Sequence, residues 1–224
     1  MHPLKISAKI QNSVCGNDPQ FPIDGILLYA EMKEIYGDNI IDPKFDEVLY
    51  PDTVPLAKKH SETEFWYYAA SFAQYEAKGE YIQRWHKRFR DEYSQMIDFQ
   101  GRRGKVIIGQ GQYKAYQMPL ISYLIDEMWW YVVGEKERIE YLLSRISYLG
   151  KKRAQGQGLV MKWKVEEIPE DWSEIKDDRW TRAVPCKFLE DIRPGMNFTY
   201  RSYRPPYWHP SSFAMCTVPG WSLK

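Results

Sequence analysis

Residues 150–158 combine glycine with adjacent cations, in the order Gly-Lys-Lys-Arg-Ala-Gln-Gly-Gln-Gly. Glycine lets a backbone approach phosphate closely, its amide binds anionic oxygen, and neighbouring cations add charge-assisted hydrogen bonds. The segment lacks the Gly-Lys-Ser/Thr ending of a nucleotide-binding P-loop. We predict that it binds RNA or another phosphate ligand; the alternative is a solvated, flexible turn. The predicted contact residues are Lys151, Lys152, Arg153, Gln155, Gly156 and Gly158.

A second basic segment, residues 78–112, interleaves cations with aromatic rings, and its residues 84–90 are Arg-Trp-His-Lys-Arg-Phe-Arg. Cations contact phosphates and rings stack on bases, so this composition favours nucleic-acid binding. Apolar side chains between Ile82 and Met96 recur at helical spacing, which predicts an amphipathic helix. A solvated charged face on that helix is the alternative explanation of the charges. The candidate RNA contacts in and beside this segment are Arg84, Trp85, His86, Lys87, Arg88, Arg90, Arg102, Arg103, Lys105 and Lys114.

A third segment, residues 200–208, mixes arginine and aromatic rings on a proline-stiffened backbone, Tyr-Arg-Ser-Tyr-Arg-Pro-Pro-Tyr-Trp. Such a segment can stack on bases, dock onto a partner subunit or cover a sheet. We favour packing or a protein contact, because proline-aromatic tails usually wrap a core or a surface. The candidate RNA or subunit contacts here are Arg201, Tyr203 and Arg204.

The residue types that carry catalysis are scattered along the chain. The four histidines, His2, His60, His86 and His209, have no metal-ligand spacing, and the three cysteines form no CxxC pair that would indicate zinc or a disulfide framework. The carboxylates show no paired motif for two-metal chemistry. We therefore predict no catalytic residue, no metal and no cofactor. A metal-independent ribonuclease needs only one acid or base, often histidine beside Lys or Tyr, so His86 and His209 keep that alternative open.

Length and composition set wider limits. The chain has 224 residues, which suits either one medium domain with insertions or one domain plus a small extension. Its formal net charge is only +1, so a nucleic-acid partner has to be recognised through local clusters of charge. Aromatic residues make up 16%, more than a small core needs, which indicates interface or ligand contacts. There is no signal-peptide pattern and no apolar run of about 18 to 20 residues, so we expect a soluble, cytoplasmic protein without membrane association.

The elements that must position these segments can be inferred from periodicity. Apolar and polar residues alternate over 4–10, and apolar residues recur at helical spacing from Ile23 toward Gly37, with Asp24 as an acceptor near the helix start. Further strands are predicted at 64–76, 127–133 and 159–166, and a second helix at 139–149. The order is β-α-β-β-α-β, which predicts an α+β, ferredoxin-like (RRM-like) sheet. We expect this domain to span 1–168, with 78–112 as a thumb-like insertion, and 169–224 to pack on it as an extension.

Four stretches together resemble a known family. They are Pro-Ile-Asp-Gly-Ile-Leu-Leu-Tyr-Ala at 22–30, Trp-His-Lys-Arg-Phe at 85–89, Tyr-Lys-Ala-Tyr-Gln-Met-Pro-Leu at 113–120, and the helix end with its glycine-rich loop at 149–158. In this order they resemble the RAMP superfamily of CRISPR-associated proteins. More narrowly, the chain is similar to the Cas-five-like subunit of type IV effector complexes, over roughly residues 4 to 166.

The resemblance implies a non-catalytic subunit that caps the repeat-derived 5′ handle of the guide RNA and helps nucleate a multisubunit DNA-targeting effector complex. It implies contacts with a backbone (Cas-seven-like) subunit and the large subunit, and with target DNA indirectly through the complex. It also implies that residues 151–158 bind the handle and that a thumb bends the RNA. The implied thumb residues are Arg84, Lys87, Arg88, Arg102, Arg103 and Lys105. The alternatives are a metal-independent endoribonuclease that processes repeat RNA and an interaction scaffold that touches no RNA.

Overall fold

The fold of the chain is α+β, with mostly strands and two helices in the part that is described. The computed structural model describes residues 1–16, 20–37, 54–97, 106–190, 192 and 196–220. The central sheet is built from β1 (His2–Ile10), β2 (Ser13–Cys15), β5 (Gln74–Lys87), β6 (Tyr116–Gly134) and β7 (Val160–Glu167).

The strands of the sheet lie in the order β7–β1–β6–β5, and each neighbouring pair is antiparallel. The short strand β2 also pairs with β6, beyond the end of β1. Ile6 on the central strand lies opposite Trp130 on one side and Val165 on the other. The alternation predicted for 4–10 is confirmed, since Leu4, Ile6 and Ala8 are fully buried.

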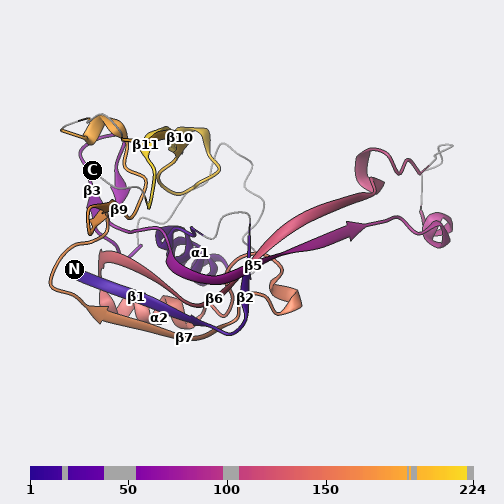
Figure 1. Ribbon diagram of the computed structural model, residues 1–224, viewed down its shortest axis with the longest axis horizontal. Helices are drawn as coiled ribbons and strands as arrows, with labels where there is room; N and C mark the ends of the chain where they lie inside the picture. The colour runs from indigo at the N-terminus through magenta and orange to yellow at the C-terminus, as the bar shows by residue number, and fades with distance from the viewer. Residues whose placement is uncertain (17–19, 38–53, 98–105, 191, 193–195, 221–224) are drawn as a thin grey trace.

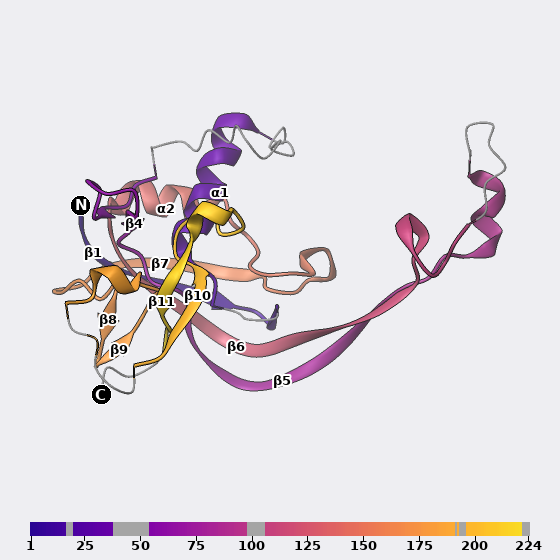
Figure 2. The ribbon, with the colours of Figure 1, turned by 90° about the horizontal axis from the view of Figure 1, so that it is seen from above.

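Two helices, α1 (Ile23–Tyr36) and α2 (Lys136–Ser144), lie on the same side of the sheet (Figure 2). The first helix is confirmed as predicted, and it ends at Gly37, whose φ of 63° suits glycine. The second ends earlier than expected. Its last predicted apolar positions, such as Leu149, are buried in extended chain that pairs with the start of β7, because this tertiary pairing replaces further helical turns.

The helix predicted across Ile82 to Met96 is wrong. Most of that stretch is the strand β5, which pairs with β6 in a register that sets Trp85 opposite Met118. Hydrogen bonds to a long partner strand override a local apolar spacing that is ambiguous by itself. The predicted strand at 64–76 is also mostly wrong, since only β4 (Tyr67–Tyr68) and the start of β5 are strand there.

The strand β5 and the paired part of β6 form a long, curved two-stranded ribbon that begins within the sheet and continues beyond it (Figures 1 and 2). We call these paired residues, 74–87 and 116–129, the ribbon. Two short 3-10 helices lie toward its far end, η1 (Asp91–Met96) and η2 (Gly111–Tyr113). The candidate residues Arg102, Arg103 and Lys105 fall outside the described residues.

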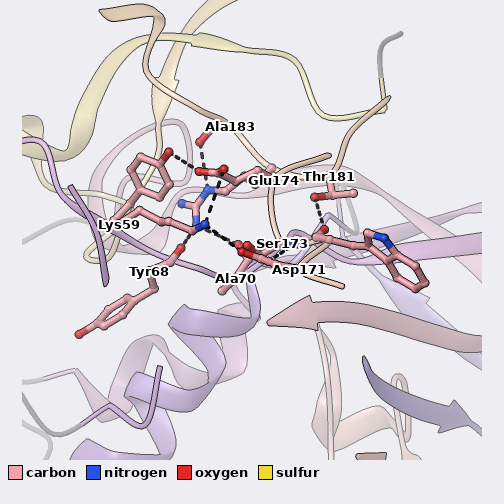
Figure 3. A network of polar contacts seen from close by, with 11 residues as sticks. Lys59, Tyr68, Ala70, Asp171, Ser173, Glu174, Thr181 and Ala183 are labelled. Carbon is pink, nitrogen blue, oxygen red and sulfur yellow. Dashed lines mark hydrogen bonds and ion pairs between the residues drawn. The ribbon is translucent and has the colours of Figure 1, made fainter. Parts of the chain in front are cut away.

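The C-terminal segment forms small two-stranded pairs: β8 (Ile175–Lys176) with β9 (Arg179–Trp180), and β10 (Phe198–Ser202) with β11 (Phe213–Thr217). A similar pair, β3 (Lys58–Lys59) with β4, lies beside it (Figure 1). The segment is anchored by Arg182, which is fully buried and donates to the carbonyl oxygens of Tyr68, Ala70 and Tyr203. Around this site, Lys59 pairs with Asp171 at 2.8 Å (Figure 3).

A second anchor joins the C-terminal segment to α1. The hydroxyl of Tyr207 donates to both carboxylate oxygens of Asp24, at 2.7 and 2.9 Å. Asp24 is fully buried, and burial raises the pKa of its carboxyl above the ordinary value, although Arg182, Tyr207 and Gly25 oppose that shift. As expected, Asp24 accepts from a backbone amide near the helix start, that of Gly25 at 2.8 Å, but the extension also covers this carboxylate through Tyr207. Neither described helix is long and apolar enough to cross a membrane.

Candidate nucleic-acid interface

Residues 150–158, which we call the glycine-rich loop, have a defined backbone. Gly150, Gly156 and Gly158 have positive φ, and Lys152 adopts the left-handed conformation with φ of 62°. A Cβ on Gly158 would lie 1.8 Å from the carbonyl oxygen of Leu149, so only glycine fits there without a backbone shift. The turn therefore depends on glycine for two reasons, its conformation and the close approach of the backbone at Leu149.

The base of the loop is fixed to the sheet through β2. The amide of Gly158 donates to Ser13 O at 2.7 Å, and the amide of Lys151 donates to Cys15 O at 2.8 Å. Between these bonds, the amide of Leu149 donates to Gly158 O at 2.8 Å and closes the loop. The loop thus presents its central residues from a hydrogen-bonded platform rather than from a free chain.

The loop meets the ribbon, although the two segments are far apart in the sequence. Lys152 Nζ lies 3.8 Å from the centre of the Trp85 ring. The hydroxyl of Tyr81 lies 3.0 Å from Ser13 Oγ, and Gln157 bonds to both Tyr81 and Ser13. Figure 2 shows the loop inside the curve of the ribbon. Two segments predicted separately as RNA contacts are therefore brought together in one place.

The hydrogen bond with Ser13 lowers the pKa of the Tyr81 phenol below its ordinary value, against an opposing effect of burial. Through its hydroxyl, Tyr81 links the ribbon to Ser13 on β2 and to Gln157 on the loop by hydrogen bonds. The sequence interpretation missed Tyr81 and Ser13 as site residues. The alternation of strand side chains would have found Tyr81, since it lies on the same face as Trp85, but Ser13 carries no sequence signal.

Alternation along β5 divides the predicted basic cluster between two faces of the ribbon. The face that meets the loop carries Tyr81, Trp85 and Lys87. On this face, the centres of the Trp85 and Tyr116 rings lie 5.3 Å apart. We call this the loop-side face. Arg84 and His86 alternate with these residues, point to the opposite, outer face, and are exposed. A helix would not have separated the cations in this way.

The other predicted residues are spread more widely. Lys151, Arg153, Gln155 and Gly156 are exposed on the loop, and none of its cations forms an ion pair within the described residues. Three exposed cations, Arg88, Arg90 and Lys114, lie beyond the paired strands toward the far end of the ribbon.

The segment at 200–208 is not part of this interface. Tyr203 is only 1% exposed and packs in the apolar cluster of the extension, which is the arrangement that the sequence favoured for the segment. Arg204 donates to the Glu64 carbonyl at 2.7 Å, and Arg201 lies over the Phe72 ring at 5.0 Å.

The two histidines considered for catalysis lie on different elements. His86 projects from the outer face of the ribbon, whereas the His209 ring accepts a hydrogen bond from the Ser211 amide in the extension. Among the described residues, no group of three or more His, Cys, Asp or Glu side chains could hold a metal ion.

One family model covers the glycine-rich loop, both described helices and most of the C-terminal extension. The family model of CRISPR type IV associated protein Csf3 matches residues 2–219. The chain belongs to this family. The resemblance to the Cas-five-like subunit of type IV systems is thereby confirmed, and the match includes the extension, for which the sequence had offered no motif. A search of curated proteins found no match.

Proposed function

We propose that the chain is a non-catalytic RNA-binding subunit that caps the repeat-derived 5′ handle of a CRISPR guide RNA. The observation that carries this proposal is the contact of Lys152 with Trp85, which joins the phosphate-binding chemistry of the loop to the stacking chemistry of the ribbon. Membership of a CRISPR type IV family makes a guide RNA the expected ligand. The cytoplasm is the compartment in which we expect this complex to act.

We also propose that the sheet is ferredoxin-like and belongs to the RAMP superfamily. The strand order β7–β1–β6–β5 with antiparallel neighbours supports this, as do the helices placed between β1 and β5 and between β6 and β7. In such a fold the glycine-rich loop follows the second helix, which is where residues 150–158 lie. The ribbon would then serve as the thumb.

The interface suits a single RNA strand. Lys151 and Lys152 supply cations for phosphate oxygens, and the exposed rings of the loop-side face supply platforms for bases. Base–ring stacking is tolerant of sequence, so this surface would recognise the handle chiefly by its backbone and its bend. Recognition of a target sequence would come from guide pairing elsewhere in the complex.

The same proposal assigns the partners. The chain would contact the backbone (Cas-seven-like) subunit next to the handle and the large subunit beside it, and would meet target DNA only through the assembled complex. The ribbon reaches well away from the sheet, which suits a contact with a neighbouring subunit or with RNA between subunits (Figure 1).

The test is to sequence RNA that copurifies with the tagged full chain after ultraviolet crosslinking in cells. We expect repeat-spacer guides with crosslinks concentrated in their first nucleotides. The variant Lys151→Ala/Lys152→Ala/Arg153→Ala should lose this RNA. The matched control replaces Lys136, Lys162 and Arg179, three cations on α2, β7 and β9, and should keep it.

Equal loading of the loop variant and the wild type would remove the loop from the proposal. Recovery of no discrete RNA would favour the scaffold alternative. Incubation of the purified chain with repeat RNA in EDTA tests the endoribonuclease alternative, since the proposal expects the RNA to stay intact.

A further inference from the structure

A pocket of about 220 Å³ lies next to the glycine-rich loop, and none of its described lining residues belongs to the ribbon. Its walls come from the start of α1 and from the chain that links α2 to the loop. The rings of Phe21, Tyr29 and Tyr148 line it, together with Ile26, Leu149 and Arg153. An engineered cavity of about 150 Å³ in another protein takes up benzene, so this pocket has room for one planar aromatic group.

The pocket is preformed. Phe21 is fixed by its carbonyl oxygen, which accepts a hydrogen bond from the indole of Trp130 at 2.8 Å. Leu149 is 3% exposed, and a Cβ on Gly150 would lie 2.7 Å from Cys15 O, so the chain cannot easily move here. Tyr29 and Tyr148 are 40% and 36% exposed, and therefore offer ring surface to a ligand.

Two adjacent cations of the loop have different neighbours. Lys152 points to Trp85 on the ribbon, whereas Arg153 lines the pocket. Lys152 and Arg153 are adjacent in the chain, so a strand whose phosphates contact both cations would have a nucleotide beside the pocket. Arg153 is also the only charged side chain in the described lining, so the mouth suits a group attached to an anion.

We propose that this pocket receives one unstacked nucleobase of the RNA strand that the loop binds. The inference rests on the proposed function and adds a base-binding site to it. Rings and aliphatic side chains would enclose the base, while Arg153 holds the neighbouring phosphate. An apolar side chain of a partner protein would fit the walls as well, but it would leave the arginine without an anionic partner.

The test uses synthetic RNA with the 5′ sequence of the copurified guide, carrying one abasic nucleotide at each position in turn. Binding to the full chain is measured by fluorescence anisotropy. We expect one abasic position to weaken binding by about 5- to 150-fold, the range typical of a stacked base. In Tyr29→Ala/Tyr148→Ala, intact RNA should bind more weakly by a similar factor, and the abasic penalty at that position should disappear.

The matched control is Tyr141→Ala/Tyr200→Ala, which removes two exposed tyrosines outside the pocket and should leave both affinities unchanged. If RNA binding depends on the loop cations but the pocket variant keeps every abasic penalty, the pocket inference is overturned and the proposed function stands. If the pocket variant binds RNA normally and instead loses a partner subunit on copurification, the occupant is a protein side chain and the inference is also overturned. If binding is independent of the loop cations, the proposed function fails first.

Discussion

At the scale of single residues, two glycines of the loop allow the cost of a left-handed backbone to be measured apart from the cost of a steric clash. Gly156 and Gly158 have φ of 78° and 70°, but only at Gly158 would a Cβ meet another chain segment. We expect Gly156→Ala to lower the free energy of unfolding by about 1 kcal/mol, through its left-handed backbone. Gly158→Ala should cost about 3 kcal/mol, because a steric clash is added. Urea denaturation measures both values, and equal costs would contradict the close approach.

Asp24 makes the stability of the chain depend on pH. Burial raises the pKa of its carboxyl in the folded state above the ordinary value of 3.8, so the folded state holds the proton more tightly than the unfolded state. The contribution of this group therefore falls as pH rises from about 3.8 through the raised pKa, by at most about 1.4 kcal/mol per pH unit. We expect the stability of the wild type relative to Asp24→Asn to decrease over that window in urea titrations. A relative stability that rises with pH would show that the carboxylate is favoured by folding.

At the scale of elements, the two faces of the ribbon provide a matched pair of variants. The variant Trp85→Ala/Lys87→Ala removes an indole ring and an ammonium group from the loop-side face. The variant Arg84→Ala/His86→Ala removes a guanidinium group and an imidazole ring from the outer face. We expect the first pair to weaken RNA binding by about tenfold or more, since it takes away a stacking platform beside the loop. The second pair should change affinity by less than about threefold, the order of one surface phosphate contact. A larger loss in the outer-face variant would place the RNA on that side.

The C-terminal segment depends on one buried cation for its attachment. Arg182 donates to carbonyl oxygens of Tyr68, Ala70 and Tyr203, and its guanidinium lies 4.3 Å from the centre of the Tyr67 ring. We expect Arg182→Ala to lower the free energy of unfolding by roughly 3 to 5 kcal/mol, because it leaves buried acceptors unpaired. The exposed neighbour Arg179 is the control, and its alanine variant should stay within about 0.5 kcal/mol of wild type in thermal or urea unfolding.

At the scale of the whole molecule, a formal net charge of +1 gives little general attraction for RNA. Binding should therefore depend on salt through the few cations of the interface. We expect the logarithm of affinity to fall linearly with the logarithm of salt concentration. Removing Lys151, Lys152 and Arg153 should reduce that slope by about 2, at about 0.7 for each single-strand phosphate contact. Replacing Lys136, Lys162 and Arg179 should leave it unchanged, and an equal reduction in both variants would indicate nonspecific attraction.

Several features of the chain follow from local sequence. The alternation of 4–10 and the spacing from Ile23 to Gly37 each reflect one buried face, so they predict β1 and α1 correctly. The glycine-rich composition of residues 150–158 is visible in the sequence, and Gly150, Gly156 and Gly158 have positive φ, whereas RNA binding by this loop stays a prediction. Family membership could also be recognised from four short stretches, because their combination and order along the chain are more specific than any one of them.

Other features depend on contacts between residues that are distant in the sequence, and only the tertiary structure shows them. Residues near Trp85 have a spacing compatible with a helix, and they become a strand because β6 supplies hydrogen-bond partners some 30 residues further along the chain. That change separates Arg84 from Lys87 and brings Trp85 to Lys152. Asp24 is buried only because Tyr207, from the other end of the chain, covers it. In each case the deciding partner is distant in sequence, so no local pattern of side chains could have indicated it.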